Sequence, residues 1–294
     1  MKIAAVDIGS NAIRLFIAKV ELTKDKKINI EKLAHTRIPI RLGEDVFTFG
    51  RISNEKVNQL ADALMGFKYI VKSLAIEHFQ VCATSALRTA ENRDSVVKRI
   101  SQETGISIKI LTGSEEASLI YSNFELYELP QDRNYLFIDV GGGSTELTII
   151  ENNEKKISQS FEIGTVRMLL NDQVKIPAAI LKWLKSNLTK NTEYEGIATG
   201  GNINSAFKIL EKKQKEIASV KELIELKSSI SKLSKTQRMN KFRIREDRAD
   251  VLLPALNIYT QIASAANIET LVAPKFGLAD GIVLNEFKNN LELV

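Results

Sequence analysis

The sequence predicts an α/β protein built from two duplicated units, and two observations lead to this fold class. First, a strand–turn–strand design with an Asp-x-Gly turn occurs twice, at Asp7 and at Asp139. Second, each turn is followed by a similar order of β-rich and helix-periodic segments, βββαβα. Apolar runs that end in glycine turns are typical of buried strands, and a recurring order indicates a repeated structural unit.

The first half is expected to contain a β-hairpin, a third strand and then alternating helices and strands. Ser53 and Asn92 are residue types that cap helix N-termini, and Gly105 is typical of a helix end. Residues 43–51 read as a loop. The expected strands are 2–8, 13–22, 28–42, 79–83 and 106–111, and the expected helices are 53–75, 92–105 and 113–128.

The second half repeats the pattern and continues with further helices. We assign 1–128 to the first domain, 129–280 to the second, and expect the helix 281–294 to pack back on the first. No low-complexity linker separates the halves, so we expect two packed domains with a cleft between them. The expected strands are 135–138, 145–150, 156–161, 196–198 and 270–273, and the expected helices are 166–170, 178–189, 202–213, 220–233, 247–266 and one from 278.

Composition is typical of an ordinary soluble protein. The 294 residues are 44% hydrophobic and 26% charged, and the longest apolar runs are far shorter than a membrane span. No signal-peptide pattern opens the chain, so we expect a cytoplasmic protein with no membrane partner. The single cysteine, Cys82, excludes an internal disulfide and reads as a buried thiol, and two histidines argue against a zinc site.

Positive charge is concentrated in one tract. The net charge is +5, and residues 205–248 contain 13 Lys and Arg against 6 Asp and Glu. Such an excess favours an anionic partner, and a set of solvated helix faces is the alternative.

The turn from Asp139 to Glu146 has the composition of a phosphate site. Its three glycines let the backbone approach an anion and direct N–H groups at it. Asp139 and Glu146 are hard oxygen ligands suited to Mg²⁺ beside a phosphate. A strand follows the turn, whereas a helix would follow in a P-loop or a dinucleotide-binding turn. The alternative is a glycine-rich hairpin with two exposed acids.

Several motifs together resemble one family. The sequence resembles the superfamily of actins, heat-shock chaperones and sugar kinases, with actin-like (ribonuclease H-like) domains, and within it the exopolyphosphatase/guanosine pentaphosphate phosphatase family. It departs from the family at Asn202, where Thr is usual, and at Ala279-Asp280, where Arg-Glu is usual. The motifs are Asp7–Asn11 with Arg14-Leu15, Ala83–Arg88, Gly113–Ala117, Asp139–Glu146, Gly164–Arg167 and Arg248–Asp250.

The resemblance implies roles for particular residues. Glu116 matches the catalytic glutamate that orients the attacking water, with Glu115 as its rival, and Arg88 and Arg14 match phosphate-contacting arginines. The implied phosphate-binding residues are Gly9, Ser10, Asn11, Gly141, Gly142, Gly143, Ser144 and Thr145, and the implied Mg²⁺ (or Mn²⁺) ligands are Asp139, Glu146 and, less directly, Asp7.

The turn containing Thr199, Gly200 and Gly201 has three open interpretations: it holds guanosine, lines a polyphosphate path, or lets a strand and a helix pack closely.

The implied activity is release of terminal orthophosphate from inorganic polyphosphate, with guanosine pentaphosphate as the alternative substrate. Rivals from other classes are an ATP-dependent small-molecule kinase and a non-enzymatic actin-like nucleotide-binding protein. A homodimer is a further expectation, and no nucleic-acid partner is expected.

Overall fold

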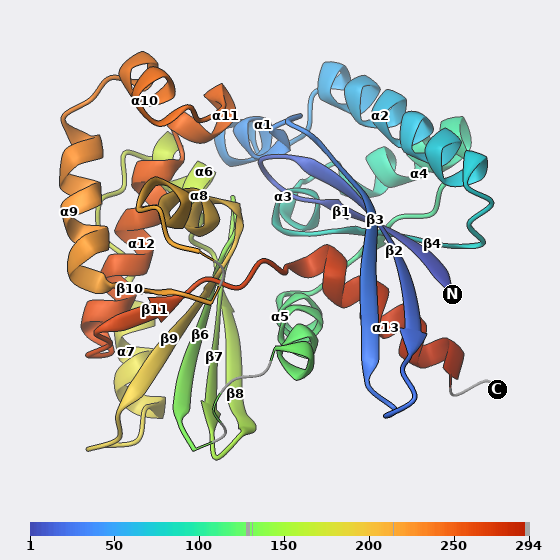
Figure 1. The fold of residues 1–294 in the computed structure, drawn as a ribbon. Helices are drawn as coiled ribbons and strands as arrows, with labels where there is room; N and C mark the ends of the chain where they lie inside the picture. The colour runs from blue at the N-terminus through green and yellow to red at the C-terminus, as the bar shows by residue number, and fades with distance from the viewer. Residues whose placement is uncertain (128–129, 131, 214, 292–294) are drawn as a thin grey trace. The chain divides into compact units, whose positions relative to one another are not determined.

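The structure is a computed structural model that describes residues 1–127, 130, 132–213 and 215–291. The chain divides into two compact units, Met1–Glu128 with Phe276–Val294 and Leu129–Lys275 (Figure 1). The ends of two expected helices, at 128 and at 292–294, lie outside the described residues. None of the described helices is long and apolar enough to cross a membrane.

The first unit is a mixed sheet with helices on both faces. Its strand order is β3-β2-β1-β4-β5, with β1 to β3 antiparallel and with β4 and β5 parallel to β1. The strands are β1 (Lys2–Ile8), β2 (Ile13–Leu22), β3 (Ile28–Ile38), β4 (His78–Ala83) and β5 (Lys109–Ile110). The helices are α1 (Leu42–Phe49), α2 (Asn54–Ser73), α3 (Ser85–Thr89), α4 (Arg93–Thr104), α5 (Gly113–Ser122), the 3₁₀ helix η1 (Asn123–Leu126) and α13 (Leu278–Leu291).

Alternation along β1 divides its side chains between the two faces of this sheet. Ala4, Val6 and Ile8 join a buried core with residues of α2, α3 and α4. The opposite face, which carries Asp7, is covered by α13, which contacts β1, β2 and α5 (Figure 1). Successive residues of a strand point to opposite faces, so these apolar side chains face the core while Asp7 lies on the other face of the sheet.

The second unit repeats this topology with one extra edge strand. Its order is β10-β11-β9-β6-β7-β8, and α12 lies at the centre of its helices, in contact with α6, α7, α8 and α9. The strands are β6 (Asn134–Val140), β7 (Thr145–Glu151), β8 (Glu154–Phe161), β9 (Tyr194–Thr199), β10 (Ile217–Ser219) and β11 (Thr270–Val272). The helices are α6 (Thr165–Leu170), α7 (Ala178–Asn187), α8 (Gly201–Ile209), α9 (Val220–Ser231), α10 (Lys235–Phe242), α11 (Glu246–Ala249) and α12 (Leu252–Ala265). The predicted α/β class with a duplicated unit is therefore confirmed.

Three predictions about local structure were wrong. Residues 43–51 mostly form α1 instead of a loop. Asn92 occupies an N-cap position but does not cap, because its side chain bonds both main-chain groups of Ile52. The single helix expected at 247–266 is two helices, and Pro254 explains the break because proline fits only the first turn of α12. Ser53 does cap α2, accepting from the N–H of Lys56.

Candidate active site

The two Asp-x-Gly turns have the same hydrogen-bonded structure. In the first unit, Gly9 N–H donates to the carbonyl of Ala12 at 3.1 Å, and in the second, Gly141 N–H donates to the carbonyl of Ser144 at 3.0 Å. Each turn joins two antiparallel strands whose flanking residues pair, Asp7 with Arg14 and Asp139 with Glu146. The two turns are therefore structural equivalents, residue by residue.

In each unit, the segment after the third strand binds the carbonyl groups of the turn. Arg41 and Gly43 N–H donate to the carbonyls of Asn11 and Ser10 at 3.1 and 2.8 Å. In the second unit, the first residues of α6 donate to the carbonyls of Gly141 and Gly142. The turns are thus held from their carbonyl side.

The glycine turn of the second unit leaves N–H groups for another acceptor. Among the described residues, the N–H groups of Gly142 and Gly143 have no main-chain acceptor. Gly164 packs so closely against Gly142 and Gly143 that a Cβ on it would collide with their backbone. A glycine turn whose N–H groups are not used by the main chain is suited to bind an anion.

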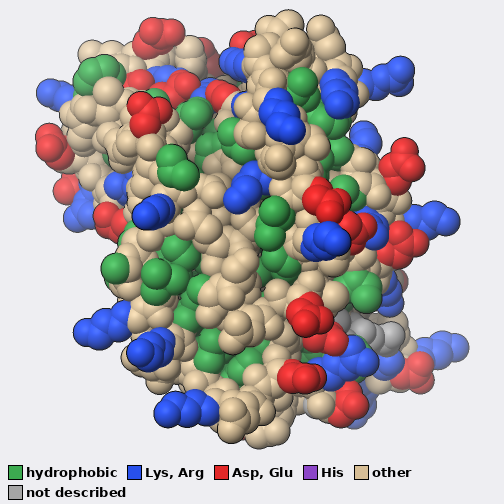
Figure 2. Space-filling model, turned by 90° about the vertical axis from the view of Figure 1, so that its left-hand side faces the viewer, with side chains coloured by type: hydrophobic (Ala, Val, Ile, Leu, Met, Phe, Trp, Pro, Cys, Tyr) green, Lys and Arg blue, Asp and Glu red, His purple; other side chains and the backbone are tan. Residues whose placement is uncertain are grey.

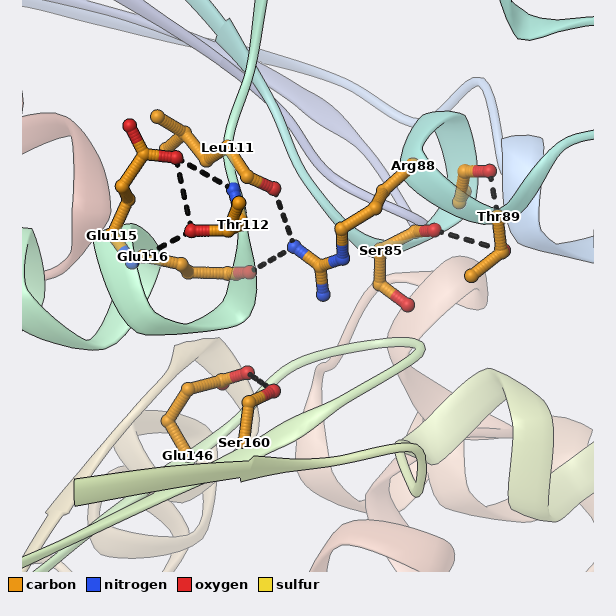
Figure 3. A network of polar contacts seen from close by, with 10 residues as sticks. Ser85, Arg88, Thr89, Leu111, Thr112, Glu115, Glu116, Glu146 and Ser160 are labelled. Atoms are coloured by element: carbon orange, nitrogen blue, oxygen red, sulfur yellow. Dashed lines mark hydrogen bonds and ion pairs between the residues drawn. The ribbon is translucent and has the colours of Figure 1, made fainter.

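Beside this turn, the sheet of the second unit carries two buried acids and two hydroxyls in one row. Asp139 pairs with Glu146 on β7 and with Thr199 on β9, and Glu146 pairs with Ser160 on β8. Asp139 and Glu146 are 9% and 1% exposed. Thr199 Oγ1 donates to Asp139. Ser160 Oγ donates to Glu146 at 2.7 Å (Figure 3). The alternative of two exposed acids is wrong.

This row suits a hydrated divalent cation. Two carboxylates directly opposite each other in a buried site are unfavourable unless a proton or a cation lies between them. The described residues contain no group of three or more His, Cys, Asp or Glu side chains that could hold a metal ion. Mg²⁺ commonly uses one or two carboxylates and takes its other ligands from water and phosphate, so Asp139 and Glu146 fit it.

The equivalent row of the first unit has the opposite charge. Asp7 pairs with Arg14 on β2 and with Cys82 on β4, and Arg14 pairs with Arg37 on β3. The Arg14 guanidinium forms an ion pair with Asp7. Asp7, predicted as a lesser metal ligand, thus holds an arginine in this structure. Cys82 is the predicted buried thiol, and burial raises its pKa to about 11.

The two remaining candidates for catalysis meet in one ion pair. Arg88 reaches from the last turn of α3 to the start of α5 (Figure 3). Its Nη1 donates to Glu116 Oε2 at 3.0 Å and to the carbonyl of Leu111 at 2.9 Å. Glu116 is 7% exposed. Arg88 thereby fixes one oxygen of the Glu116 carboxylate.

Glu115, the rival of Glu116, has a structural role. It forms a capping box with Thr112, whose N–H and Oγ1 donate to Glu115 Oε2 at 2.8 and 3.0 Å. These bonds from Thr112, together with Lys109, lower the pKa of Glu115 to about 2. The side chain is therefore tied to the helix N-terminus.

The turn at Thr199–Gly201 is shaped by packing. Gly200 has φ of 116°, which favours glycine, and a Cβ there would lie 2.9 Å from the carbonyl oxygen of Val140. A Cβ on Gly201 would lie 2.5 Å from Arg248 Nη1. Tyr259 Oη donates to the carbonyl of Thr199. Close packing therefore accounts for Gly200, whereas at Gly201 the neighbour is the end of a flexible arginine side chain.

The basic tract is not a single surface. Arg238 donates to the carbonyls of Ile230 and Ala249, each at 3.1 Å, and Lys235 forms an ion pair with Glu246 at 3.0 Å. Figure 2 shows the face with α9 and α10, where Lys and Arg side chains are scattered among acidic and hydrophobic ones. This arrangement favours the second interpretation of the tract, in which much of it consists of solvated helix faces.

Sequence reasoning missed three residues of the two rows, namely Thr199 as a partner of Asp139, Ser160 and Arg37. Counting from the two-residue turn Asn152-Asn153 would pair Glu146 with Gln159, and the pairing with Ser160 arises from a register shift between Ile149 and Ile150. Thr199 and Arg37 depend on pairing between strands whose register the local sequence does not specify.

The chain matches the model of the Ppx/GppA phosphatase family over residues 20–290. It is 32% identical over 234 residues to a bifunctional 3-dehydroquinate synthase/phosphatase from Fusobacterium nucleatum, which covers 71% of this chain and 34% of the relative. The chain thus spans about a third of that relative's length. It is 23% identical over 313 residues to exopolyphosphatase 1 of Mycobacterium leprae, covering 99% of this chain and 91% of the relative.

Among solved structures, an exopolyphosphatase from Cytophaga hutchinsonii superimposes with a TM-score of 0.83 at 22% identity, covering 98% of both chains. That likeness shows the fold, two α/β units of the same topology. The chain therefore belongs to the Ppx/GppA phosphatase family.

Proposed function

We propose that this chain is a divalent-cation-dependent exophosphatase that releases terminal orthophosphate from inorganic polyphosphate. One observation carries the proposal: the row of the second unit contains the acid pair Asp139–Glu146, whereas the equivalent row of the first unit contains two arginines, Arg14 and Arg37, and one acid, Asp7. Phosphoanhydride hydrolysis uses both kinds of group, a cation held by carboxylates and guanidinium groups that bind phosphate oxygens.

Different residues have different roles in the proposed reaction. The N–H groups of Gly142 and Gly143 bind phosphate oxygens, and Asp139 and Glu146 hold Mg²⁺ or Mn²⁺. When bound, the cation neutralises phosphate charge. Arg14, fixed by Asp7, binds a further phosphate oxygen. Phosphoryl transfer through a loose transition state depends mainly on such positioning and charge stabilisation.

Glu116 orients the attacking water. Its carboxylate is held by Arg88 on one oxygen, so it acts as a positioned acceptor of a hydrogen bond from water. A loose transition state needs little proton abstraction, so such an acceptor is sufficient. Arg88 lies where it can exchange part of its contact with Glu116 for a phosphate oxygen, as a planar guanidinium can contact two partners.

Guanosine pentaphosphate is the second candidate substrate, since its 5′-triphosphate end offers the same terminal phosphoanhydride. The kinase and the actin-like rivals require a nucleotide, and close packing against Val140 accounts for Gly200 without one. The expectations of a cytoplasmic location, a homodimer and no nucleic-acid partner stay predictions.

Phosphate release from tripolyphosphate, long polyphosphate, guanosine pentaphosphate and ATP, each with and without Mg²⁺, tests the proposal. We expect Mg²⁺-dependent release from the two polyphosphates. Release from guanosine pentaphosphate alone would select the second candidate. Phosphate transfer from ATP to an added small molecule, or polymer formation with ATP, would contradict the proposal.

A further inference from the structure

A cavity in the second unit is lined by residues of α7, α9, α12 and the segment that precedes α7. Both α7 and α9 contact α12, so the three helices lie together (Figure 1). The cavity has a volume of about 290 Å³, which is at the lower end of the range for small-molecule sites. Its size therefore suits a ligand of a few non-hydrogen atoms.

One side of the cavity is apolar. It is lined by Ile176, which is buried, and by Leu181 and Ile224, which are 45% and 42% exposed. Single exposed aliphatic side chains are common at protein surfaces. Here, however, two of them line the same cavity as a buried isoleucine, so one apolar group bound there would remove both from water.

The wall that contains Ile176 is fixed to α12 by side-chain hydrogen bonds. Gln261 Oε1 accepts from the Ile176 N–H at 3.2 Å, and Gln261 Nε2 donates to the carbonyl of Val174 at 2.8 Å. Asn257 Nδ2 also donates to the carbonyl of Val174. These bonds form without a ligand, so the wall is already ordered and binding does not have to order it.

Lys227 of α9 places an ammonium group on the polar side of the cavity. Its Nζ donates to Thr260 Oγ1 at 3.4 Å and to Asn257 Oδ1 at 3.5 Å, both of which are long hydrogen bonds. Thr260 Oγ1 itself donates to the carbonyl of Leu256 at 2.8 Å, so towards the lysine it is an acceptor. An ammonium group has three donors, and one donor of Lys227 is left for a ligand.

The charge of Lys227 is not balanced by an acid. The side chain is half-buried, and a second lysine that lines the cavity, Lys175, is exposed. Within the part of the chain that the structure describes, neither lysine forms an ion pair. A half-buried ammonium group with only neutral acceptors favours an anion beside it.

We propose that this cavity binds a small carboxylate with a short apolar body. The carboxylate accepts hydrogen bonds from Lys227 and Lys175, and the body covers Leu181 and Ile224. Inorganic phosphate would leave the apolar side empty, and a neutral hydrocarbon would leave the ammonium groups without an anion. The inference does not depend on the proposed phosphatase reaction, because none of its evidence comes from the candidate active site.

The test measures binding of hexanoate to the full chain by calorimetry, with hexanamide as the neutral analogue. Lys227→Gln removes the ammonium group, and Lys227→Arg keeps a positive charge. Lys208→Gln is the matched control, since Lys208 is an exposed lysine of α8 that does not line the cavity. Ser264→Trp introduces a large ring at an exposed lining position of α12, so it blocks the cavity without replacing a buried side chain.

We expect hexanoate to bind with a Kd of about 1 mM or lower, as the ligand efficiency of so small a molecule allows. Lys227→Gln weakens this binding about tenfold or more, as for loss of a hydrogen bond to a charged group, whereas Lys227→Arg retains most of it. Butyrate, which is shorter by two methylene groups, binds about tenfold more weakly than hexanoate. Ser264→Trp abolishes binding, and Lys208→Gln binds as the wild type does.

Three results would overturn the proposal. The first is no binding of hexanoate by the wild type at about 10 mM, ten times the expected Kd. The second is equal binding of hexanoate and hexanamide, which would show that no cation takes part. The third is unchanged binding in both Lys227→Gln and Ser264→Trp, which would place the hexanoate elsewhere on the chain.

Discussion

At the scale of single residues, neighbouring acids in this chain do different work because their hydrogen-bond partners differ. Glu115 binds the N-terminus of its own helix, whereas Glu116 is buried against Arg88. A position one residue along a helix points about 100° away, so adjacent side chains meet different surroundings. Arg14 and its equivalent Glu146 also differ in their partners: Arg14 forms an ion pair with Asp7, whereas Glu146 accepts a hydrogen bond from Ser160.

Glu115→Gln is expected to keep kcat and to change the dependence of stability on pH. The pKa of Glu115 is lowered to about 2 in the folded chain. Its charged form therefore stabilises the fold above the ordinary carboxyl pKa, and this contribution is lost as the pH falls through about 4.5 towards 2. The Tm difference between wild type and variant should shrink over that range. A difference independent of pH would show that the charge has no such role.

Asp139→Asn and Glu146→Gln are expected to raise the Mg²⁺ concentration for half-maximal rate, because each removes a charged oxygen ligand. If neither variant alters the Mg²⁺ dependence, the cation is held elsewhere.

At the scale of elements, the sequence predicts the strands around both turns well, because alternation and glycine position define them. It fails where tertiary contacts decide. α1 begins at an uncapped Arg41 in the left-handed region and is stabilised by bonds to Ser10 and Asn11, which no local pattern reveals. The sequence analysis also did not predict α10. This helix has a capping box, Ser234 with Gln237, that the sequence shows, but it has no buried residue and therefore no apolar stripe to indicate a helix.

α12 links the helical layer of the second unit to its candidate metal site. The fully buried Tyr259 donates to the carbonyl of Thr199, whose own hydroxyl donates to Asp139. Tyr259→Phe keeps the ring and leaves that carbonyl without its donor. We expect a loss of about 1–3 kcal/mol in the free energy of unfolding, measured by urea denaturation. Tyr69→Phe, at an exposed position of α2, is the control. Equal stability of Tyr259→Phe and wild type would contradict this account.

At the scale of the whole molecule, the positive excess of 205–248 is available to a polyanion only in part, since Arg238 and Lys235 are engaged within the fold. Lys241 and Arg245 are exposed members of the tract. If they guide long chains, Lys241→Gln/Arg245→Gln raises KM for long polyphosphate and flattens its salt dependence, as for counterion release at nucleic acids. Tripolyphosphate should be unaffected.

The control for this pair is Lys182→Gln/Lys185→Gln, which removes two exposed lysines of α7. Similar effects of both double variants on long chains would show that the tract acts only through the general positive charge of the protein. No effect of either would leave solvated helix faces as its role.

The central claim is that Glu116 orients water for hydrolysis of a terminal phosphoanhydride. Its most direct test compares orthophosphate release from tripolyphosphate with Mg²⁺ by wild type and Glu116→Gln, alongside tripolyphosphate binding by calorimetry. The substitution keeps the shape of the side chain, so we expect kcat to fall about 10²-fold or more with binding changed little. Near-normal turnover in Glu116→Gln, with Glu115→Gln inactive instead, would contradict the account.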